Sequence, residues 1–279
     1  MNYRHDYHAG NFADVAKHLA LVAALLHLRK KDRPFAAIDT HGGAGRYDLS
    51  GAAARRTGEA ATGIGKLRGL DGTALPETLK TYLDLVAREG AGAYPGSPLI
   101  TARLLRAQDR LIAIEKHPDA AAALRDVLQS FANTRAVEGD GYARSPALLP
   151  PRERRGLILI DPPYEDPDEF RIAAEALATA CRRFATGIYM LWFPVKSRAT
   201  AEAFCGEILA GGIAKALRVD IAIGAAPREE KERLTEAGLI VVNPPYGFDG
   251  EMRACAAIVA PRLGPDTRFT VTWLVGEGA

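Results

Sequence analysis

The stretch Arg155-Gly-Leu-Ile-Leu-Ile-Asp161-Pro-Pro-Tyr164 decides the fold of this chain. Its continuous apolar run over residues 156–160 is typical of a strand that is buried on both faces of a parallel sheet. The polar turn that follows contains two prolines, which end the strand because proline has no N–H to donate to a neighbouring strand. The sequence therefore predicts a central strand with a rigid polar turn at its carboxyl end.

Four other runs have the same apolar character, and each ends in a polar or glycine-rich turn. Helical patterns separate them, for example over Ser97–Gln108 and Asp119–Phe131. This alternation predicts an α/β fold with a doubly wound, open and mostly parallel sheet. Two later runs, Ala237–Val242 and Arg268–Val275, are expected to pair with each other as an antiparallel end of the sheet. The four runs are Phe35–Thr40, Leu111–Glu115, Arg135–Val137 and Ile188–Phe193.

A helix is expected before the first strand. Asn11 can cap its start, Asp14 lies in the first turn where a negative charge is favourable, and apolar residues recur at spacings of three and four. The helix should end near Lys31, because Pro34 breaks the pattern.

One spacing along the chain is too long. The first strand ends at Asp39 and the second at Glu115, which is 115 − 39 = 76 residues later. A βαβ unit needs about 30 residues, so roughly 40 to 50 residues are inserted. The segment 46–94 fits: it holds no strand-like run, but Pro76–Glu89 is an amphipathic helix pattern. We expect a main domain of residues 1–45 and 95–279 and a small helical subdomain over 46–94.

Composition excludes several classes of protein. Among 279 residues, Lys plus Arg number 36 and Asp plus Glu 34, a formal charge of +2 that is too balanced for a polybasic or acidic disordered chain. The apolar stretch Leu19–Leu28 is too short to span a bilayer, and no signal-peptide pattern precedes it. The 3 cysteines lack the spacing of a disulfide framework or zinc site. We expect a globular cytoplasmic protein.

Positive charge is concentrated in two short segments. The first 34 residues carry a cationic surplus that includes residues 29–33, and a second cluster covers residues 152–155. Either segment can be an ordinary solvated surface or a local anion-facing patch, and the sequence leaves both interpretations open.

The strand ends carry the candidate chemistry, since ligands of open α/β sheets bind at the carboxyl ends of the strands. The first strand leads into the glycine-rich turn 39–45, which equally suits close ligand approach or close packing. Glu115 ends the second strand and could accept from ribose hydroxyls, and Asp140-Gly141 after the third could accept from an adenine amine. With Asp161 after the fourth, these ends describe an adenosine-containing cofactor that faces a second planar substrate.

The tetrapeptide Asp161-Pro162-Pro163-Tyr164 suits methylation of an amine on a planar group. Such an amine is a poor nucleophile because its lone pair is delocalised into the ring. The Asp161 carboxylate and the Pro162 carbonyl can accept its two hydrogens and free the lone pair, while Tyr164 offers a stacking face worth about 1–3 kcal/mol. The alternative is a plain structural turn.

Six blocks of the sequence carry a resemblance to a known family, and the first of them is much more specific than the tetrapeptide at 161–164. They span nearly the whole chain. The blocks are Tyr3-Arg-His5-Asp-Tyr-His8-Ala-Gly-Asn11-Phe-Ala-Asp14-Val-Ala-Lys17-His18, Asp39-Thr-His41-Gly-Gly-Ala-Gly-Arg-Tyr47, Tyr94-Pro-Gly-Ser97-Pro-Leu-Ile100, Arg155-Gly-Leu-Ile-Leu-Ile-Asp161-Pro-Pro-Tyr-Glu165, Arg183-Phe-Ala-Thr-Gly187 and Gly238-Leu-Ile-Val-Val-Asn243-Pro-Pro245.

On these blocks the chain resembles the RlmJ family of bacterial methyltransferases. The resemblance implies a class I, Rossmann-like methyltransferase sheet with antiparallel late strands and a small helical insertion. It implies transfer of a methyl group from S-adenosyl-L-methionine to adenine N6 of 23S rRNA, with S-adenosyl-L-homocysteine as the other product. We expect naked or early-assembly rRNA as the partner, a monomer, and neither a membrane nor an obligate protein partner.

The resemblance also implies roles for individual residues. Asp161, with Pro162 and Tyr164, would be catalytic, and Tyr3 would contact substrate. From the residues themselves, we expect His5, Lys17 and Tyr164 to join Tyr3 in binding substrate, the first two in a mobile, cationic N-terminal segment that closes over RNA. The implied cofactor-binding residues are His18, His41, Ser97, Glu115, Asp140, Gly141 and Asp161.

Three features are interpreted as structural. Asn243-Pro-Pro-Tyr246 is a second amine-methylation tetrapeptide, but it follows a late antiparallel run far from the expected cofactor crevice. Trp192 and Trp273 lie in apolar strand runs and are expected in the core. His5 and His8 precede the helix, no cysteine joins them and the expected chemistry needs no metal, so no metal is expected. DNA adenine-N6 methylation, protein glutamine-N5 methylation and a non-catalytic role in RNA assembly stay open as alternatives.

Overall fold

The central element of the protein is an eight-stranded sheet. The computed structural model describes residues 7–70, 74–224 and 234–276. In chain order the strands of the sheet are β1 (Ala36–Asp39), β4 (Arg110–Glu115), β5 (Thr134–Glu138), β6 (Gly156–Ile160), β7 (Ile188–Pro194), β8 (Ala216–Ala222), β9 (Glu236–Val242) and β10 (Arg268–Val275).

The order of strands across the sheet is β10-β8-β9-β7-β6-β1-β4-β5. Strands β7, β6, β1, β4 and β5 are parallel, and β6 has the bounds expected from its apolar run. Strand β9 pairs antiparallel with both β7 and β8, and β10 pairs antiparallel with β8. The predicted α/β fold with a mostly parallel sheet and late antiparallel strands is confirmed.

The predicted pairing between the two late runs is wrong, because β8 lies between them. Strand β8 is difficult to predict from the sequence because Arg218 and Asp220 interrupt its apolar residues. Arg218 is nevertheless buried, and its guanidinium forms ion pairs with Asp220 and Glu202. A buried strand can hold these charges because they are paired.

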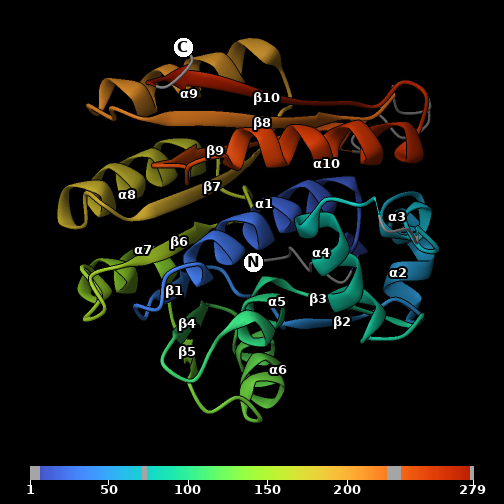
Figure 1. Ribbon diagram of the computed structural model, residues 1–279, viewed down its shortest axis with the longest axis horizontal. Coiled ribbons are helices and arrows are strands. Elements are labelled where there is room, and N and C mark those ends of the chain that lie inside the picture. Colours follow the sequence, from blue (N-terminus) through green and yellow to red (C-terminus); the bar gives the residue numbers. More distant parts are fainter. Residues whose placement is uncertain (1–6, 71–73, 225–233, 277–279) are drawn as a thin grey trace.

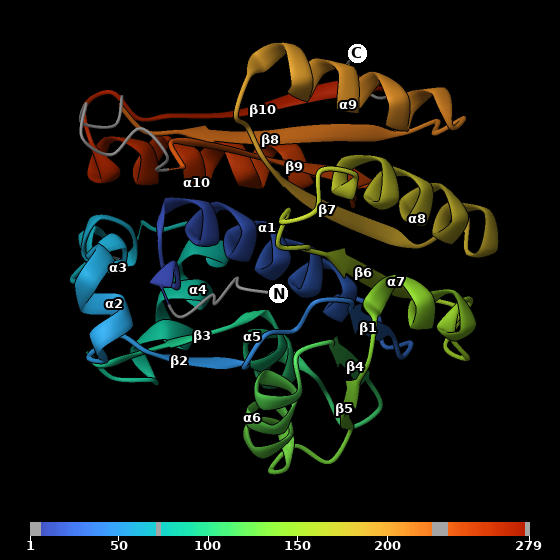
Figure 2. The same cartoon turned by 180° about the vertical axis from the view of Figure 1, so that it is seen from behind.

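Helices cover both faces of the sheet (Figures 1 and 2). Successive side chains of a strand point to opposite faces, so Leu157 and Leu159 of β6 lie in one buried cluster and Ile158 and Ile160 in another. One face carries α1 (Phe12–Arg29), α5 (Ser97–Leu104), α6 (Pro118–Leu128) and α10 (Phe248–Leu263), and the other carries α8 (Glu169–Arg183) and α9 (Arg198–Ala210). Two short helices, α7 (Gly141–Arg144) and η3 (Ser145–Leu148), follow β5.

Helix α1 is buried along most of its length. As expected, the Asn11 side chain caps it by accepting from the backbone N–H of Asp14 at 2.9 Å. It packs on the sheet, with α5 and α10 beside it on the same face, and it also contacts α4 (Glu77–Ala87). This packing puts Lys17 and His18 inside the molecule, although both are polar. None of the helices in the described ranges is long and apolar enough to cross a membrane.

The segment 46–94 contains more than helices. It holds α2 (Ala52–Thr57), α3 (Glu59–Thr62), η2 (Ile64–Lys66) and α4, as well as β2 (Arg46–Asp48) and β3 (Ala93–Pro95), which pair antiparallel at its two ends. The expectation that this segment has no strand is wrong, because strands of 3 residues are too short to show a period of two. Its division from the rest of the chain as a subdomain stays a prediction.

The insertion is joined tightly to the start of the chain. The backbone N–H of Ile64 donates to the carbonyl of Gly10 at 2.8 Å. Glu59 accepts from Asn11 Nδ2 at 2.9 Å and lies 3.0 Å from His8 Nδ1. A Cβ at Gly63 would lie only 2.2 Å from the Gly10 carbonyl oxygen, so this approach requires glycine. The insertion therefore supports the segment that leads into α1.

Candidate active site

A cavity of about 2630 Å³ lies at the carboxyl ends of the parallel strands. All the predicted site residues that the structure describes line it, although they come from six separate parts of the chain; Tyr3 and His5 lie outside the described residues. The residues brought together are Lys17, His18, His41, Ser97, Glu115, Asp140, Gly141, Asp161, Pro162 and Tyr164.

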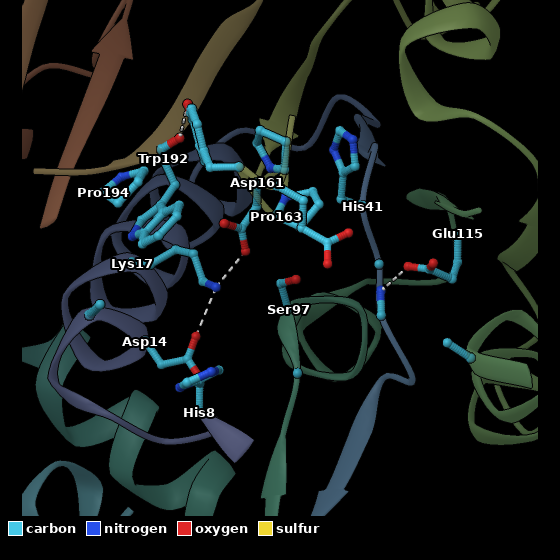
Figure 3. Close-up of a pocket in the computed structure, with 18 of the residues that line it drawn as sticks. His8, Asp14, Lys17, His41, Ser97, Glu115, Asp161, Pro163, Trp192 and Pro194 are labelled. Atoms are coloured by element: carbon cyan, nitrogen blue, oxygen red, sulfur yellow. Dashed lines mark hydrogen bonds and ion pairs between the residues drawn. The ribbon is translucent and has the colours of Figure 1, made fainter. Parts of the chain in front are cut away.

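Glu115 joins two of the strand-end turns. Its Oε2 accepts from the backbone N–H of Gly43 at 2.8 Å (Figure 3), and its Oε1 accepts from that of His117 at 2.7 Å. Gly43 has a φ of +58°, which glycine adopts without strain. Each carboxylate oxygen keeps a lone pair for a further donor. Glu115 is thus fixed in place while still able to accept from a ligand.

Asp140 and Gly141 have structural tasks at the end of β5. Asp140 caps α7 by accepting from the backbone N–H groups of Tyr142 and Ala143, and its Oδ2 lies 2.9 Å from Lys116 Nζ. Burial raises the pKa of Asp140, but the hydrogen bonds from Lys116, Ala143 and Tyr142 outweigh it and the pKa is lowered. A Cβ at Gly141 would lie 2.0 Å from the Thr40 carbonyl oxygen. Their contact with an adenine base stays a prediction.

Ser97 uses its hydroxyl differently from what its sequence position indicates. The hydroxyl donates to Asp39 Oδ2 at 2.7 Å, and both side chains are buried. It is therefore already engaged as a donor, although the start of α5 still faces the cavity at Gly96 and Ser97. Burial, with a smaller contribution from the charge of Asp161, raises the pKa of Asp39 to about 7 against the opposing hydrogen bond from Ser97.

Lys17 lies between two carboxylates (Figure 3). Its Nζ is 2.8 Å from Asp14 Oδ1 and 2.5 Å from Asp161 Oδ2, and the lysine side chain is only 4% exposed. Burial opposes the charge, but Asp14 and Asp161 hold the pKa of Lys17 well above its ordinary value. The expectation that Lys17 belongs to a mobile segment that closes over RNA is wrong, because α1 is packed on most sides. Its charge instead orients Asp161.

The buried charges at the site do not balance. Asp14, Asp39 and Asp161 are three carboxyl groups, and Lys17 is the ammonium group among them. Burial, and to a smaller extent the charge of Asp161, raises the pKa of Asp39. A cationic ligand would relieve the excess negative charge. The sulfonium of S-adenosyl-L-methionine is such a cation, so the residues present fit this cofactor.

Most of the Tyr164 side chain is covered by other residues, which leaves little of it free for a base to stack on. It is 9% exposed, its hydroxyl donates to the Trp192 carbonyl at 2.9 Å, and its ring centroid lies 4.6 Å from that of Phe170 and 5.9 Å from that of Trp192. Trp192 itself lines the cavity and is half-buried, whereas the sequence interpretation put it in the core. Its place near the carboxyl end of β7, beside β6, is the signal that could have identified it.

Two histidines border the cavity in fixed orientations. His18 Nδ1 lies 2.7 Å from the Tyr94 hydroxyl, and the two rings stack at 5.5 Å. His41 Nδ1 lies 2.8 Å from Thr40 Oγ1, and burial lowers the pKa of His41 to about 4. His41 is therefore neutral at physiological pH. Within the described ranges, no group of three or more His, Cys, Asp or Glu side chains could hold a metal ion.

The second tetrapeptide lies away from the cavity. Asn243 Nδ2 donates to the carbonyls of Ala185 and Gly187, at 2.9 and 2.8 Å, and Tyr246 is 84% exposed. Because β9 runs antiparallel to β7, this turn lies at the opposite edge of the sheet from Asp161. Its contacts are those of a structural turn.

Comparison with known proteins gives a consistent picture. The family described as "RsmJ: Ribosomal RNA large subunit methyltransferase D, RlmJ" matches residues 32–275. Two relatives, both named "Ribosomal RNA large subunit methyltransferase J", are similar over the whole length. The one from Escherichia coli (strain K12) is 40% identical over 283 residues, which cover 99% of this chain and 100% of the relative. The one from Haemophilus influenzae is 38% identical over 284 residues, with the same coverage.

A solved structure resembles this one closely. The crystal structure of protein LPL1258 from Legionella pneumophila has a TM-score of 0.86 and 33% sequence identity, over 95% of this chain and 97% of that chain. The sheet order, the cavity at its carboxyl edge and these relatives lead to one conclusion: the chain belongs to the RlmJ family and has the class I methyltransferase fold.

Proposed function

We propose that this protein transfers a methyl group from S-adenosyl-L-methionine to N6 of an adenine in 23S rRNA. The observation that carries the proposal is the Asp161 turn at the end of β6, where Lys17 holds one oxygen of the carboxylate at the wall of a large cavity. Membership of the RlmJ family favours large-subunit rRNA as the substrate.

The cofactor would bind along the strand ends. When bound, S-adenosyl-L-methionine supplies an electrophilic methyl group next to a sulfonium. In this chain Glu115 would accept from the ribose, the start of α5 would receive the carboxylate, and the excess charge around Asp161 would favour the sulfonium. The full set that we propose to hold the cofactor is His18, His41, Ser97, Glu115, Asp140, Gly141 and Asp161.

Asp161 and Pro162 would activate the amine. Lys17 engages Oδ2 of Asp161, and no described residue donates a hydrogen bond to Oδ1. The Pro162 carbonyl likewise accepts no hydrogen bond from the described residues. These two acceptors would take the two hydrogens of an exocyclic amine and direct its lone pair toward the methyl group. The catalytic effect is then mainly positioning and electrostatic stabilisation.

The cavity has room for a nucleotide beside the cofactor. Pockets for single small molecules measure about 300–1,000 Å³, and this cavity is about 2630 Å³. A base that leaves its stack must regain a few kcal/mol in the pocket. Trp192 and the exposed part of Tyr164 would contact it. Tyr3 and His5 are proposed to bind the same nucleotide from the N-terminal segment.

Parallel assays with different substrates test this proposal. Protein and labelled S-adenosyl-L-methionine are incubated with protein-free 23S rRNA, adenine-containing DNA or release-factor peptides. We expect label in the rRNA alone. Label in the DNA or in a peptide glutamine would support the adenine-N6 DNA or glutamine-N5 alternative. Cofactor binding without label in any substrate would support a non-catalytic assembly factor.

A further inference from the structure

Two cationic segments that are far apart in the sequence meet in the structure. Residues 29–33 lead into β1, and residues 152–155 lead into β6. Strands β1 and β6 are parallel neighbours with Ala36 opposite Gly156. Their amino ends therefore lie side by side, next to the end of α1 (Figures 1 and 2). The two charge clusters form one surface.

Part of this positive charge has a structural task. Arg155 donates to the carbonyls of Leu28 and Arg33, at 2.6 and 3.0 Å. Arg106 donates to the carbonyls of Arg29, Lys31 and Arg33 at 3.3, 2.9 and 3.1 Å, and forms an ion pair with Asp109. These two guanidinium groups satisfy the carbonyls at the end of α1 and of the turn after it. The positive charges of Arg155 and Arg106 are therefore explained by these local contacts.

The remaining cations have no such task. We name this surface the basic edge, and it consists of the exposed side chains of Arg29, Lys30, Lys31, Arg33, Arg152 and Arg154. Arg152 pairs with Glu153, which also pairs with Arg110, and Asp32 is the exposed acid of the same turn. The other five members have no ion-pair partner among the residues that the structure describes. Within the described part of the chain, ion pairs therefore do not neutralise these five charges.

The neighbouring groups respond to this charge. Burial, and then the charges of Lys30, Arg155 and Lys31, lower the pKa of His27 below its ordinary value. The helix dipole does not offset the surplus of positive charge, because it amounts to only about half a negative charge at the carboxyl end of α1. Like charges held together without counterions repel one another, so a surface of this kind suits a polyanion.

The basic edge is well separated from the catalytic cavity. Asp161 follows the carboxyl end of β6, and the basic edge precedes its amino end, so the 5 residues of β6 lie between them. At about 3.3 Å per residue that is roughly 17 Å through the sheet. Beside the basic edge, Arg135 lines a hollow of about 380 Å³ together with the acid Asp109 and with Arg110 and Arg152, which both pair with Glu153.

We propose that the basic edge binds the phosphate backbone of folded RNA at a distance from the nucleotide in the cavity. This inference rests on the proposed function, since it takes the substrate to be a large RNA. Phosphate contacts contribute affinity and orientation without reading sequence. The basic edge would therefore help the enzyme hold a long rRNA substrate, and a short fragment would not reach it.

The test combines Lys30→Gln, Lys31→Gln and Arg33→Gln, three exposed residues that contact neither Asp161 nor the cavity. The matched control combines Lys80→Gln, Arg262→Gln and Arg268→Gln, three exposed cations on other elements. Binding to protein-free 23S rRNA is measured against salt concentration. We expect the first variant to bind about tenfold more weakly or worse, with the salt slope reduced by about 2 to 3 units. The control should match wild type.

Methyl transfer gives a second readout. The first variant should lose kcat/KM on 23S rRNA but keep it on a short RNA trimmed to a few base pairs around the methylated adenine. Wild-type affinity and salt slope in that variant, or equal losses on long and short RNA, would overturn the inference. Failure of wild type to methylate any RNA would instead count against the proposed function, while the binding measurement would still decide the role of the basic edge.

Discussion

Two nearly identical turns in this protein have different surroundings. Asp161-Pro-Pro-Tyr164 follows a parallel strand and lines the cavity, with Lys17 on its carboxylate and Tyr164 almost fully enclosed. Asn243-Pro-Pro-Tyr246 follows an antiparallel strand at the opposite edge, with its amide engaged by two carbonyls and its tyrosine 84% exposed. The turn that we propose to be catalytic is thus distinguished by its strand direction and its charged partner as much as by its sequence.

The largest expected effect separates the two turns directly. Asp161→Ala should abolish methyl transfer to 23S rRNA, because it removes the acceptor that we place on the amine. Asn243→Ala, its matched control, loses two hydrogen bonds at a residue with a φ of +52° and should be less stable, yet keep its turnover per folded molecule. Turnover and thermal unfolding are measured on the same preparations. An Asn243→Ala variant that folds and binds the cofactor but has no activity would show that we have assigned catalysis to the wrong turn.

Lys17→Met should have the next largest effect, since it leaves Asp14 and Asp161 buried without their shared cation. Breaking a buried pair in this way destabilises a protein by about 3–5 kcal/mol. At temperatures where the variant is folded, it should also turn over at least about a hundredfold more slowly than wild type. This is the size of effect expected when a catalytic group is misplaced. Denaturant unfolding and single-turnover assays check both, with exposed Lys80→Met as the control. Wild-type values in both assays would show that the ion pair is dispensable.

Cofactor affinity should respond more moderately. Glu115→Ala removes the strand-end carboxylate that we place on the cofactor ribose, whereas Ser97→Ala removes a hydroxyl that already donates to Asp39 and should change the affinity less. Losing a hydrogen bond to a charged group costs about 1.5–3 kcal/mol, which corresponds to one to two decades in Kd. Calorimetry with S-adenosyl-L-methionine measures this. Unchanged affinity in Glu115→Ala would remove that residue from the cofactor site.

Asp39 predicts a pH dependence of stability. Its folded pKa of about 7 lies above the ordinary 3.8, so the protonated form favours folding, and this contribution is lost as the pH rises through 7. The free energy of unfolding should fall by about 2–3 kcal/mol from this group between pH 5 and pH 8. Asp39→Asn should flatten the profile. Denaturant unfolding of wild type and Asp39→Asn at pH 5 and pH 8 measures this. An equal change in the free energy of unfolding between the two pH values in both proteins would contradict the raised pKa of Asp39.

The smallest effect distinguishes the two tyrosines. Tyr164→Phe removes the hydrogen bond to the Trp192 carbonyl and should destabilise the protein by about 1 kcal/mol. Tyr246→Phe alters an exposed hydroxyl and should stay within about 0.5 kcal/mol of wild type. Thermal unfolding in parallel resolves the difference. Equal shifts would mean that the environments of the two turns are more alike than their contacts indicate.

Local signals made much of the fold predictable. A continuous apolar run gave β6 its bounds, and the Asn11 cap with regular apolar spacing marked the start of α1. Strand β8 escaped prediction because Arg218 and Asp220 interrupt its apolar pattern, and their mutual pairing is visible only in the folded chain. Strands β2 and β3 are too short to carry a pattern.

The site divides in the same way. Residues that follow strands, such as Glu115 and Asp161, could be placed because parallel strands end at one edge of a sheet. The burial of Lys17 could not be foreseen, since its partner Asp161 lies 144 positions away in the chain. Nor could the engagement of Ser97 by Asp39, which depends on how α5 packs beside β1. Sequence thus indicated which residues meet, and the structure adds which of them already bind one another.

The most direct test of the account identifies the product. Protein-free 23S rRNA is incubated with S-adenosyl-L-methionine and either wild type or Asp161→Asn, then digested to nucleosides for mass spectrometry. The account predicts N6-methyladenosine with wild type and none with Asp161→Asn, whose Asn243 turn is intact. A methyl group on another base, or N6-methyladenosine formed by Asp161→Asn within a few-fold of the wild-type rate, would contradict it.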